Sequence, residues 1–118
     1  MGEEEEWPPP EARLTSALWR AEGHFERREF FAAAQALDEV QGFGEDELVA
    51  ALRHLAAAGY RAQTGETMRA RRQLEHARRR LAPFLPRSRD LELEPLLESV
   101  REAVESADDD ANGDTELA

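Results

Sequence analysis

Residues 28–41 decide the fold, and they read REFFAAAQALDEVQ. Their apolar residues recur at steps of three and four, which places them on one stripe of an α-helix rather than on the alternating sides of a strand. The stripe consists of Phe30, Ala33, Ala34, Leu37 and Val40, and Phe31 beside Phe30 is expected to widen its buried arc. Two glycines follow at positions 42 and 44, and glycine is favoured just past the end of a helix. The segment therefore predicts an amphipathic helix that ends near residue 41.

Four further segments show the same period, and they span residues 10–25, 45–65, 67–81 and 93–105. Their ends carry residues that start or stop helices. Pro10 suits a first helical turn, Gly65 suits a left-handed cap, and Pro83 follows the end of the fourth segment. The short connections favour antiparallel neighbours. The sequence therefore predicts an all-α fold, a compact bundle of about five helices in antiparallel hairpins.

Acidic residues are concentrated at the two ends of the chain. The 118 residues include 26 acids and 15 bases, all of them arginine, for a net charge of −11. Nine of the acids lie in residues 3–6 and 108–116, where there is no base. Like charges repel, and such segments bury too little to offset their ordering entropy. We expect an acidic, proline-rich flexible arm over 1–10, a helical domain over 11–105 and an acidic disordered tail over 106–118.

The composition argues against several classes of function. The chain has no cysteine, which excludes disulfides, thiolate metal sites and cysteine nucleophiles. No apolar run approaches the roughly 20 residues of a membrane span, and no cationic and apolar leader is present, so we expect a cytoplasmic protein without membrane contact. The sequence has no glycine-rich phosphate loop and no nucleophile elbow. His24, His54 and His76 fall in three different predicted helices, so we expect no metal and no cofactor.

The helix over 28–41 has an echo 37 residues later, where Ala33, Leu37 and Val40 are matched by Ala70, Leu74 and Ala77. This pattern resembles the second helix of tetratricopeptide repeats. That resemblance implies a protein–protein adaptor that grips a peptide between its hairpins. Two stacked helical hairpins explain the echo equally well, because tetratricopeptide arrays have a period of about 34 residues and at least three copies.

A second resemblance extends over residues 11–105. It rests on FFAAAQALD at 30–38, LAAA at 55–58, Gly65 and the paired leucines at 96–97, in this order and spacing. These stretches resemble the domain of unknown function 309 family. The resemblance implies a compact all-helical domain without an established activity, acting as a non-catalytic binding or structural module.

The resemblance also implies candidate site residues. On that alignment the family's His-Glu pair falls on Ala34 and Gln35, its second Glu on Asp38 and a histidine of the next helix on Tyr60. Gln35, Asp38 and Tyr60 are therefore candidate binding residues. Because the imidazole and the first carboxylate are missing, a metal-dependent or hydrolytic role is disfavoured, although an enzyme with a degenerate site around these three residues stays an alternative.

Arginine is the other candidate feature. Nine arginines lie between positions 61 and 89 against two glutamates, most of them in the predicted helix 67–81. The candidate binding residues among them are Arg71, Arg72, Arg78 and Arg79. Nucleic acid is disfavoured, since the chain is strongly negative and no aromatic residue lies among the arginines of that helix. Neutralisation by acidic neighbours in the same molecule is the simplest expectation. The alternative is a contact with an unidentified protein or with a second copy, giving a homodimer.

Overall fold

The structure, a computed structural model, describes the backbone of residues 10–40 and 47–117 and the side chains of these ranges up to Ala107. The helices are α1 (Pro10–Glu26), α2 (Phe30–Asp38), α3 (Glu47–Gln63), α4 (Thr67–Leu81) and α5 (Leu93–Leu117). A 3₁₀ turn, η2 (Ala82–Phe84), and two short strands, β1 (Arg87–Ser88) and β2 (Leu91–Glu92), connect α4 to α5. The all-α bundle of helical hairpins is confirmed.

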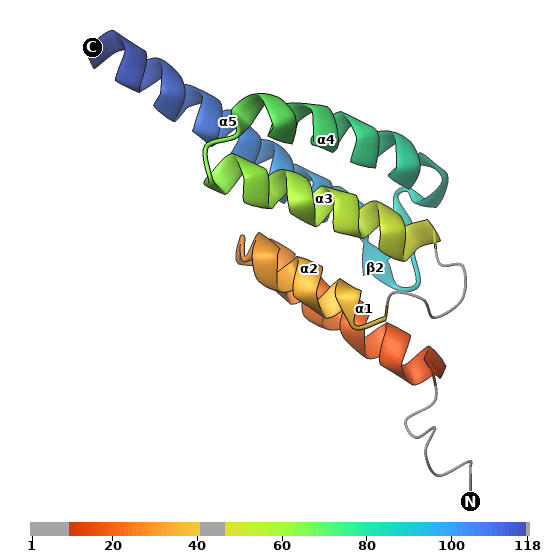
Figure 1. Cartoon of the computed structure of the whole chain (residues 1–118). Helices are drawn as coiled ribbons and strands as arrows, with labels where there is room; N and C mark the ends of the chain where they lie inside the picture. Colours follow the sequence, from red (N-terminus) through yellow and green to blue (C-terminus); the bar gives the residue numbers. More distant parts are fainter. Residues whose placement is uncertain (1–9, 41–46, 118) are drawn as a thin grey trace, which may run out of the picture.

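The helices form two hairpins and a covering helix (Figure 1). α1 pairs with α2, and α3 pairs with α4. α3 is the central element, because it packs against α2, α4 and α5. In the view of Figure 1, α2, α3 and α4 lie in front and α5 lies behind α3 and α4. The front of the bundle is therefore built by three helices, and α5 covers the opposite side.

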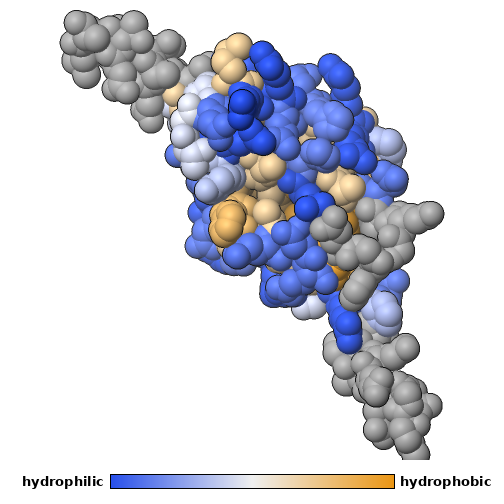
Figure 2. Space-filling view, viewed as in Figure 1, coloured by the Kyte–Doolittle hydropathy of each residue, from blue (hydrophilic) through white to orange (hydrophobic). Residues whose placement is uncertain are grey.

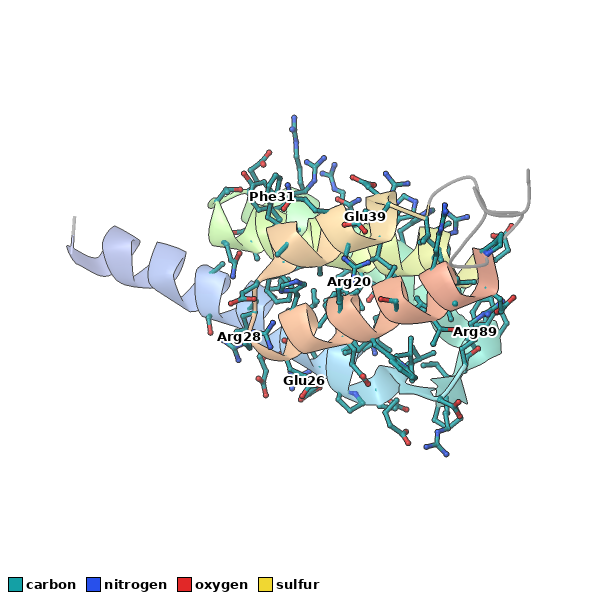
Figure 3. All side chains as sticks on the ribbon, turned by 90° about the horizontal axis from the view of Figure 1, so that it is seen from below. Arg20, Glu26, Arg28, Phe31, Glu39 and Arg89 are labelled. Atoms are coloured by element: carbon teal, nitrogen blue, oxygen red, sulfur yellow. The ribbon has the colours of Figure 1, made fainter. Side chains whose placement is uncertain are left out.

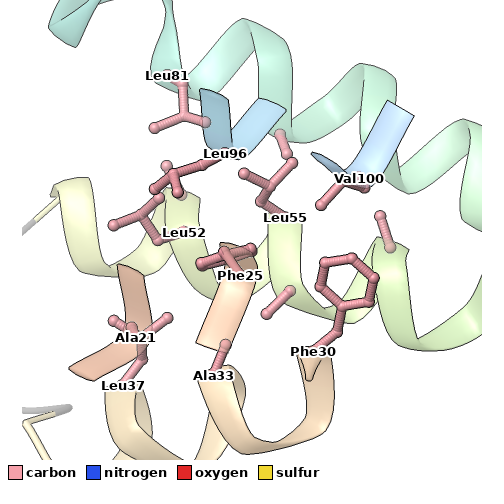
Figure 4. Close-up of a cluster of buried hydrophobic side chains, with 14 of the residues drawn as sticks. Ala21, Phe25, Phe30, Ala33, Leu37, Leu52, Leu55, Leu81, Leu96 and Val100 are labelled. Carbon is pink, nitrogen blue, oxygen red and sulfur yellow. The ribbon is translucent and has the colours of Figure 1, made fainter. Parts of the chain in front are cut away.

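All five helices contribute to one hydrophobic cluster (Figure 4). Phe25 and Phe30 meet edge to face at its centre, with ring centroids 6.0 Å apart and an interplanar angle of 61°. Leu55 of α3 and Val100 of α5 are fully buried beside them. Within the described residues no polar or charged side chain is fully buried, so apolar packing alone holds the centre of the bundle.

The two hairpins share one type of connection. Arg28 after α1 and Gly65 after α3 both have a left-handed backbone, with φ of 59° and 87°. The N–H groups of Arg28 and Glu29 donate back to carbonyls of α1, and those of Gly65 and Glu66 donate back to carbonyls of α3, at 2.8–3.2 Å. This is the Schellman arrangement that ends many helices. The left-handed cap predicted at Gly65 is confirmed. The two left-handed residues, Arg28 and Gly65, are 37 positions apart, which is also the interval between the echoed helix positions.

Helix bounds agree closely for three of the predicted segments and differ for two. α2 is shorter than predicted, since Arg28 and Glu29 belong to the connection that ends α1. α5 is longer than the predicted segment, with a helical backbone that extends to Leu117, while the disorder expected over 106–118 stays a prediction. Once the buried first part of a helix is docked, each further residue costs little to add. The arm predicted over 1–10 lies outside the described residues, except for Pro10, which begins α1.

The hairpin of β1 and β2 was not predicted. The strands pair antiparallel, with Arg87 opposite Glu92 and Ser88 opposite Leu91. The turn residues Arg89 and Asp90 have φ of 51° and 64°, as a type I′ turn requires. Strands of two residues show no alternation in a sequence, and the turn lacks the Asn-Gly or Asp-Gly pair that usually marks it.

Ion pairs connect elements that are distant in the sequence. Arg20 of α1 donates to both carboxylate oxygens of Glu39, after α2, at 3.2 and 2.9 Å (Figure 3). This contact holds the pKa of Glu39 below its ordinary value. Arg89 in the turn between β1 and β2 donates to Glu11 of α1 at 2.7 Å. None of the helices in the described ranges is both long and apolar enough to cross a membrane.

Candidate functional site

The exposed side of α2, α3 and α4, opposite α5, carries the candidate residues. We call it the α2–α3–α4 face and define it by Phe31, Gln35, Asp38, Arg53, Ala57, Tyr60, Arg72, His76 and Arg79. In each helix these residues are three, four or seven positions apart, so they lie along one stripe. Figure 2 views the molecule from this side, with apolar side chains between hydrophilic ones.

The seam between α2 and α3 holds two contacts. The rings of Phe31 and Tyr60 lie 5.3 Å apart at 41°, and their side chains are 54% and 42% exposed. Two turns along α2, Arg53 Nε donates to Asp38 Oδ1 at 2.8 Å. Gln35 is exposed and lies one turn from both Phe31 and Asp38. The structure therefore brings Gln35, Asp38 and Tyr60 to one exposed seam.

The chemistry of this seam is that of a surface rather than of an enclosed pocket. Gln35, Asp38 and Tyr60 are all exposed to solvent. The Asp38 carboxylate is engaged by Arg53, so it is not held against a nucleophile or a second acid as a general base would be. In the part of the chain that the structure describes, no three His, Asp or Glu side chains are placed to hold a metal ion. The arrangement suits contact with another chain.

The sequence placed Phe31 together with Phe30 on a widened buried stripe, and this is wrong for Phe31. Phe30 is fully buried and its ring lies against Gly59 of α3. Phe31 points to the outside of α2 and meets Tyr60 instead (Figure 3). α3 covers only one side of α2, so neighbouring phenylalanines differ in burial. The exposed aromatic pair is therefore a functional candidate that the sequence did not reveal.

The four candidate arginines divide between two sides of α4. Arg72 and Arg79 share a stripe with His76, which contacts α3. Arg78 lies on the other side, where it lines a small hollow with residues of α5, namely Glu94, Leu97, Glu98 and Arg101. Arg71 lies seven residues before Arg78 on the same stripe. Arg72 and Arg79 thus belong to the α2–α3–α4 face, and Arg71 and Arg78 to the side that faces α5.

Acidic neighbours pair with several arginines around α4, in line with the neutralisation that the sequence suggested. Arg80 lies 3.3 Å from Glu47 at the start of α3, and Arg69 lies 3.2 Å from Glu66. Arg72 and Arg79 differ, because neither has a hydrogen-bond or ion-pair partner among the described residues. These two guanidinium groups are exposed and available to a ligand.

A pair of histidines lies between α3 and α4. The rings of His54 and His76 meet edge to face, with centroids 4.7 Å apart, and Gln73 Nε2 lies 3.4 Å from His54 Nδ1. Burial lowers the pKa of His54, and the charges of His76, Arg80 and Arg53 lower it further. The sequence contained a signal for this contact. Both histidines lie 11 residues from Gly65, and positions equidistant from the turn of an antiparallel hairpin face each other.

The comparisons with known proteins identify no relative. No family model, curated protein or solved structure matches the chain. The resemblances to the domain of unknown function 309 family and to tetratricopeptide repeats stay predictions from the sequence, and the geometry of the α2–α3–α4 face carries the functional proposal.

Proposed function

We propose that this protein is a non-catalytic binding module, an adaptor of two helical hairpins that holds a segment of another chain on the α2–α3–α4 face. The observation that carries the proposal is the exposed pair Phe31 and Tyr60, which lies on the same face as Arg72 and Arg79, two arginines without a partner among the described residues. A few residues carry most of the binding energy at protein interfaces, and tyrosine and arginine are enriched among them.

The two hairpins support an adaptor with tetratricopeptide-like architecture. Their connections have the same hydrogen-bond pattern at an interval of 37 residues, and the echoed positions Ala33, Leu37, Ala70 and Leu74 are all buried. Such hairpins leave the outer sides of several helices free to form one continuous surface. Here that surface is the α2–α3–α4 face.

The enzyme alternative has weaker support. It would need Gln35, Asp38 and Tyr60 to converge on a substrate in a concave site that excludes water. They lie instead on an exposed seam, and Asp38 is held by Arg53. Nucleic acid is also a weaker candidate, since the chain carries a net charge of −11 and a phosphate backbone crossing this seam would meet Asp38.

Selection from a random peptide library on the immobilised full chain tests the proposal. We expect selected peptides whose dissociation constants rise by about tenfold or more in the Phe31→Ala, Tyr60→Ala double variant, because an aromatic anchor contributes on the order of 1–2 kcal/mol. The matched control is Trp19→Ala. Trp19 is 57% exposed but lies on α1, where it lines a shallow hollow with Glu11 and Thr15 away from the α2–α3–α4 face, and its removal should leave the affinity unchanged.

Two results would contradict the proposal. One is the failure of repeated selections to yield any binding peptide. The other is peptides that bind the double variant as tightly as the original chain, with thermal melts showing that both are folded. A labelled oligonucleotide serves as the further arm of the test. Binding to it that weakens steeply with salt and depends on Arg72 and Arg79 would favour nucleic acid instead.

A further inference from the structure

The α2–α3–α4 face sets chemical requirements on the segment that it binds. Arg72 and Arg79 are two helical turns apart, about 10 Å along α4, and both are exposed without a partner among the described residues. The two arginines favour a ligand with carboxylates, which form charge-assisted hydrogen bonds with guanidinium groups. Across the face, the tilted pair Phe31 and Tyr60 offers a platform for an aromatic or proline side chain. The matching segment is acidic and carries such a residue beside its acids.

The sequence of this chain contains one terminal segment of that kind. Residues 3–10 read EEEEWPPP, a run of four acids followed directly by Trp7 and by prolines. The acidic run near the other end, at 108–110, has no aromatic residue beside it. The acids of residues 3–6 complement Arg72 and Arg79 in charge, and Trp7 with its prolines suits the aromatic pair. Proline-rich segments are commonly bound in grooves lined by aromatic residues.

Trp7 cannot reach the aromatic pair within its own molecule. Pro10 begins α1, and Phe31 lies just beyond the other end of that helix, in the first turn of α2. α1 has 17 residues and so a length of about 25 Å. The three Cα-to-Cα steps from Pro10 back to Trp7 span at most about 10 Å. In Figure 3, Arg89, which bonds to Glu11 in the first turn of α1, lies at the opposite end of the bundle from Phe31.

We propose that two copies of the chain associate, each placing residues 3–7 on the α2–α3–α4 face of the other. The proposal rests on the function proposed above for that face. Such a mutual exchange has two-fold symmetry and leaves no arm or face unoccupied, so assembly stops at a dimer and does not continue to a filament. Electrostatic repulsion between the bodies is small, since residues 7–107 hold 17 acids and 15 arginines. The attraction is between charges and weakens as salt rises.

Trp7 reports the association directly. The chain has two tryptophans, so Trp19→Phe leaves Trp7 as the only one. In full-length chain carrying this change, we expect the emission of Trp7 to shift to shorter wavelength as protein concentration rises, in step with dimer formation in sedimentation equilibrium. Both signals should reverse at high salt. A chain that stays monomeric up to its solubility limit, with a constant Trp7 emission, would overturn the proposal.

Matched charge variants on one helix test the face. Arg72→Gln with Arg79→Gln should raise the dimer dissociation constant by about tenfold. Arg71→Gln with Arg78→Gln removes the same charge from the side of α4 that faces α5, and should change it little. Equal effects of the two double variants would overturn the assignment of the dimer contact to this face.

Complementation separates this proposal from other dimers. One variant has a defective arm, with Glu3, Glu4, Glu5 and Glu6 changed to Gln and Trp7→Ala. The other has a defective face, with Phe31→Ala and Tyr60→Ala. We expect each alone to be monomeric and the mixture to form a heterodimer with one arm engaged. A dimer that survives in the arm variant would overturn the proposal. A mixture that stays monomeric, although the arm variant still binds library-selected peptides on its face, would overturn it too, while leaving the proposed function standing.

Discussion

At the scale of single residues, Gly59 decides how closely α2 approaches α3. Its Cα faces the ring of Phe30, and a Cβ built there would lie 2.5 Å from Phe30 Cδ2. Real contacts of this kind are not that short, so a side chain at this position would force the ring or the helices apart. The absence of a side chain is therefore a packing requirement, although glycine weakens the helix.

We expect Gly59→Ala to lower the free energy of unfolding by about 1–3 kcal/mol, because overpacking outweighs the helix propensity of alanine. Urea unfolding followed by circular dichroism measures the change. Gly23→Ala in α1 is the matched control. The nearest atom to a Cβ there is the flexible Arg27 guanidinium at 3.3 Å, so this change should stabilise by up to about 1 kcal/mol. Two variants with shifts of the same sign would contradict the packing argument.

His54 gives the second prediction at this scale. Burial between α3 and α4, with His76, Arg80 and Arg53 nearby, lowers its pKa in the folded state. The unfolded chain therefore binds the proton more readily, and stability contributed by neutral His54 is lost as pH falls below the ordinary histidine value of about 6.5. We expect the free energy of unfolding to fall between about pH 7.5 and pH 5.5, and to fall less in His54→Gln. An identical pH slope in the variant would contradict this.

At the scale of elements, the two hairpin connections have the same backbone conformation but different residues at the left-handed position. Position 28 carries arginine and position 65 carries glycine, yet both are left-handed. Arg28 has an additional contact, a hydrogen bond of 2.7 Å to Glu102 of α5. Exposed pairs of this kind contribute 0–1 kcal/mol, roughly what a left-handed side chain costs, so the arginine is tolerated there.

We expect the usual preference for alanine over glycine to be inverted at both connections. Arg28→Gly should be more stable than Arg28→Ala by about 1 kcal/mol. Both variants lose the contact with Glu102, but only glycine adopts the left-handed conformation without a steric penalty. Gly65→Ala should cost a similar amount, about 1 kcal/mol. Thermal melts of the three variants supply the comparison. If Arg28→Ala proves the more stable of the two, the left-handed conformation at position 28 is wrong.

At the scale of the whole molecule, one cluster of apolar side chains unites the two hairpins and α5. Leu37 of the short helix α2 is fully buried in it. Because α2 has only nine residues, it depends on this packing rather than on its own helix propensity. Loss of a core contact in α2 should therefore weaken the whole domain, including the helices of the second hairpin.

We expect Leu37→Ala to lower the free energy of unfolding by about 2–5 kcal/mol through the cavity that it leaves. The loss should appear as one cooperative transition, with circular dichroism and tryptophan fluorescence giving the same midpoint. An early transition in the fluorescence alone, recorded in a Trp7→Phe background so that Trp19 reports on α1, would show that the first hairpin unfolds separately.

Helices could be predicted because their signal is local. The stripe Phe30, Ala33, Leu37 and Val40 is buried as its spacing indicated, and the segment 67–81 coincides with α4. The hairpin of β1 and β2 could not be predicted, because two-residue strands carry no periodicity. The helical backbone of α5 beyond residue 105 was missed, since the acidic composition of 106–118 says nothing about a helix that continues from a docked beginning.

The candidate site was only partly accessible to the same reasoning. The resemblance to a family proposed Gln35, Asp38 and Tyr60, and the structure places all three on one seam. The four arginines looked like one cluster in the sequence, but helical geometry divides them between two faces. The exposure of Phe31 could not be predicted, because the sequence grouped it with the buried Phe30. The contact of the two histidines depends on the antiparallel pairing of α3 and α4.

The sequence by itself determined the helices, their buried stripes and the left-handed turn at Gly65, because each depends on residues within a few positions of one another. Only the tertiary structure decided which side of each stripe is covered. α3 buries Phe30 and leaves Phe31 exposed, while acidic side chains from other segments engage Arg53 and Arg80 and leave Arg72 and Arg79 free among the described residues. Whether a side chain is exposed, and whether it has an ion-pair partner, depends on residues that are distant in the sequence. Only the packing of the helices brings those residues together.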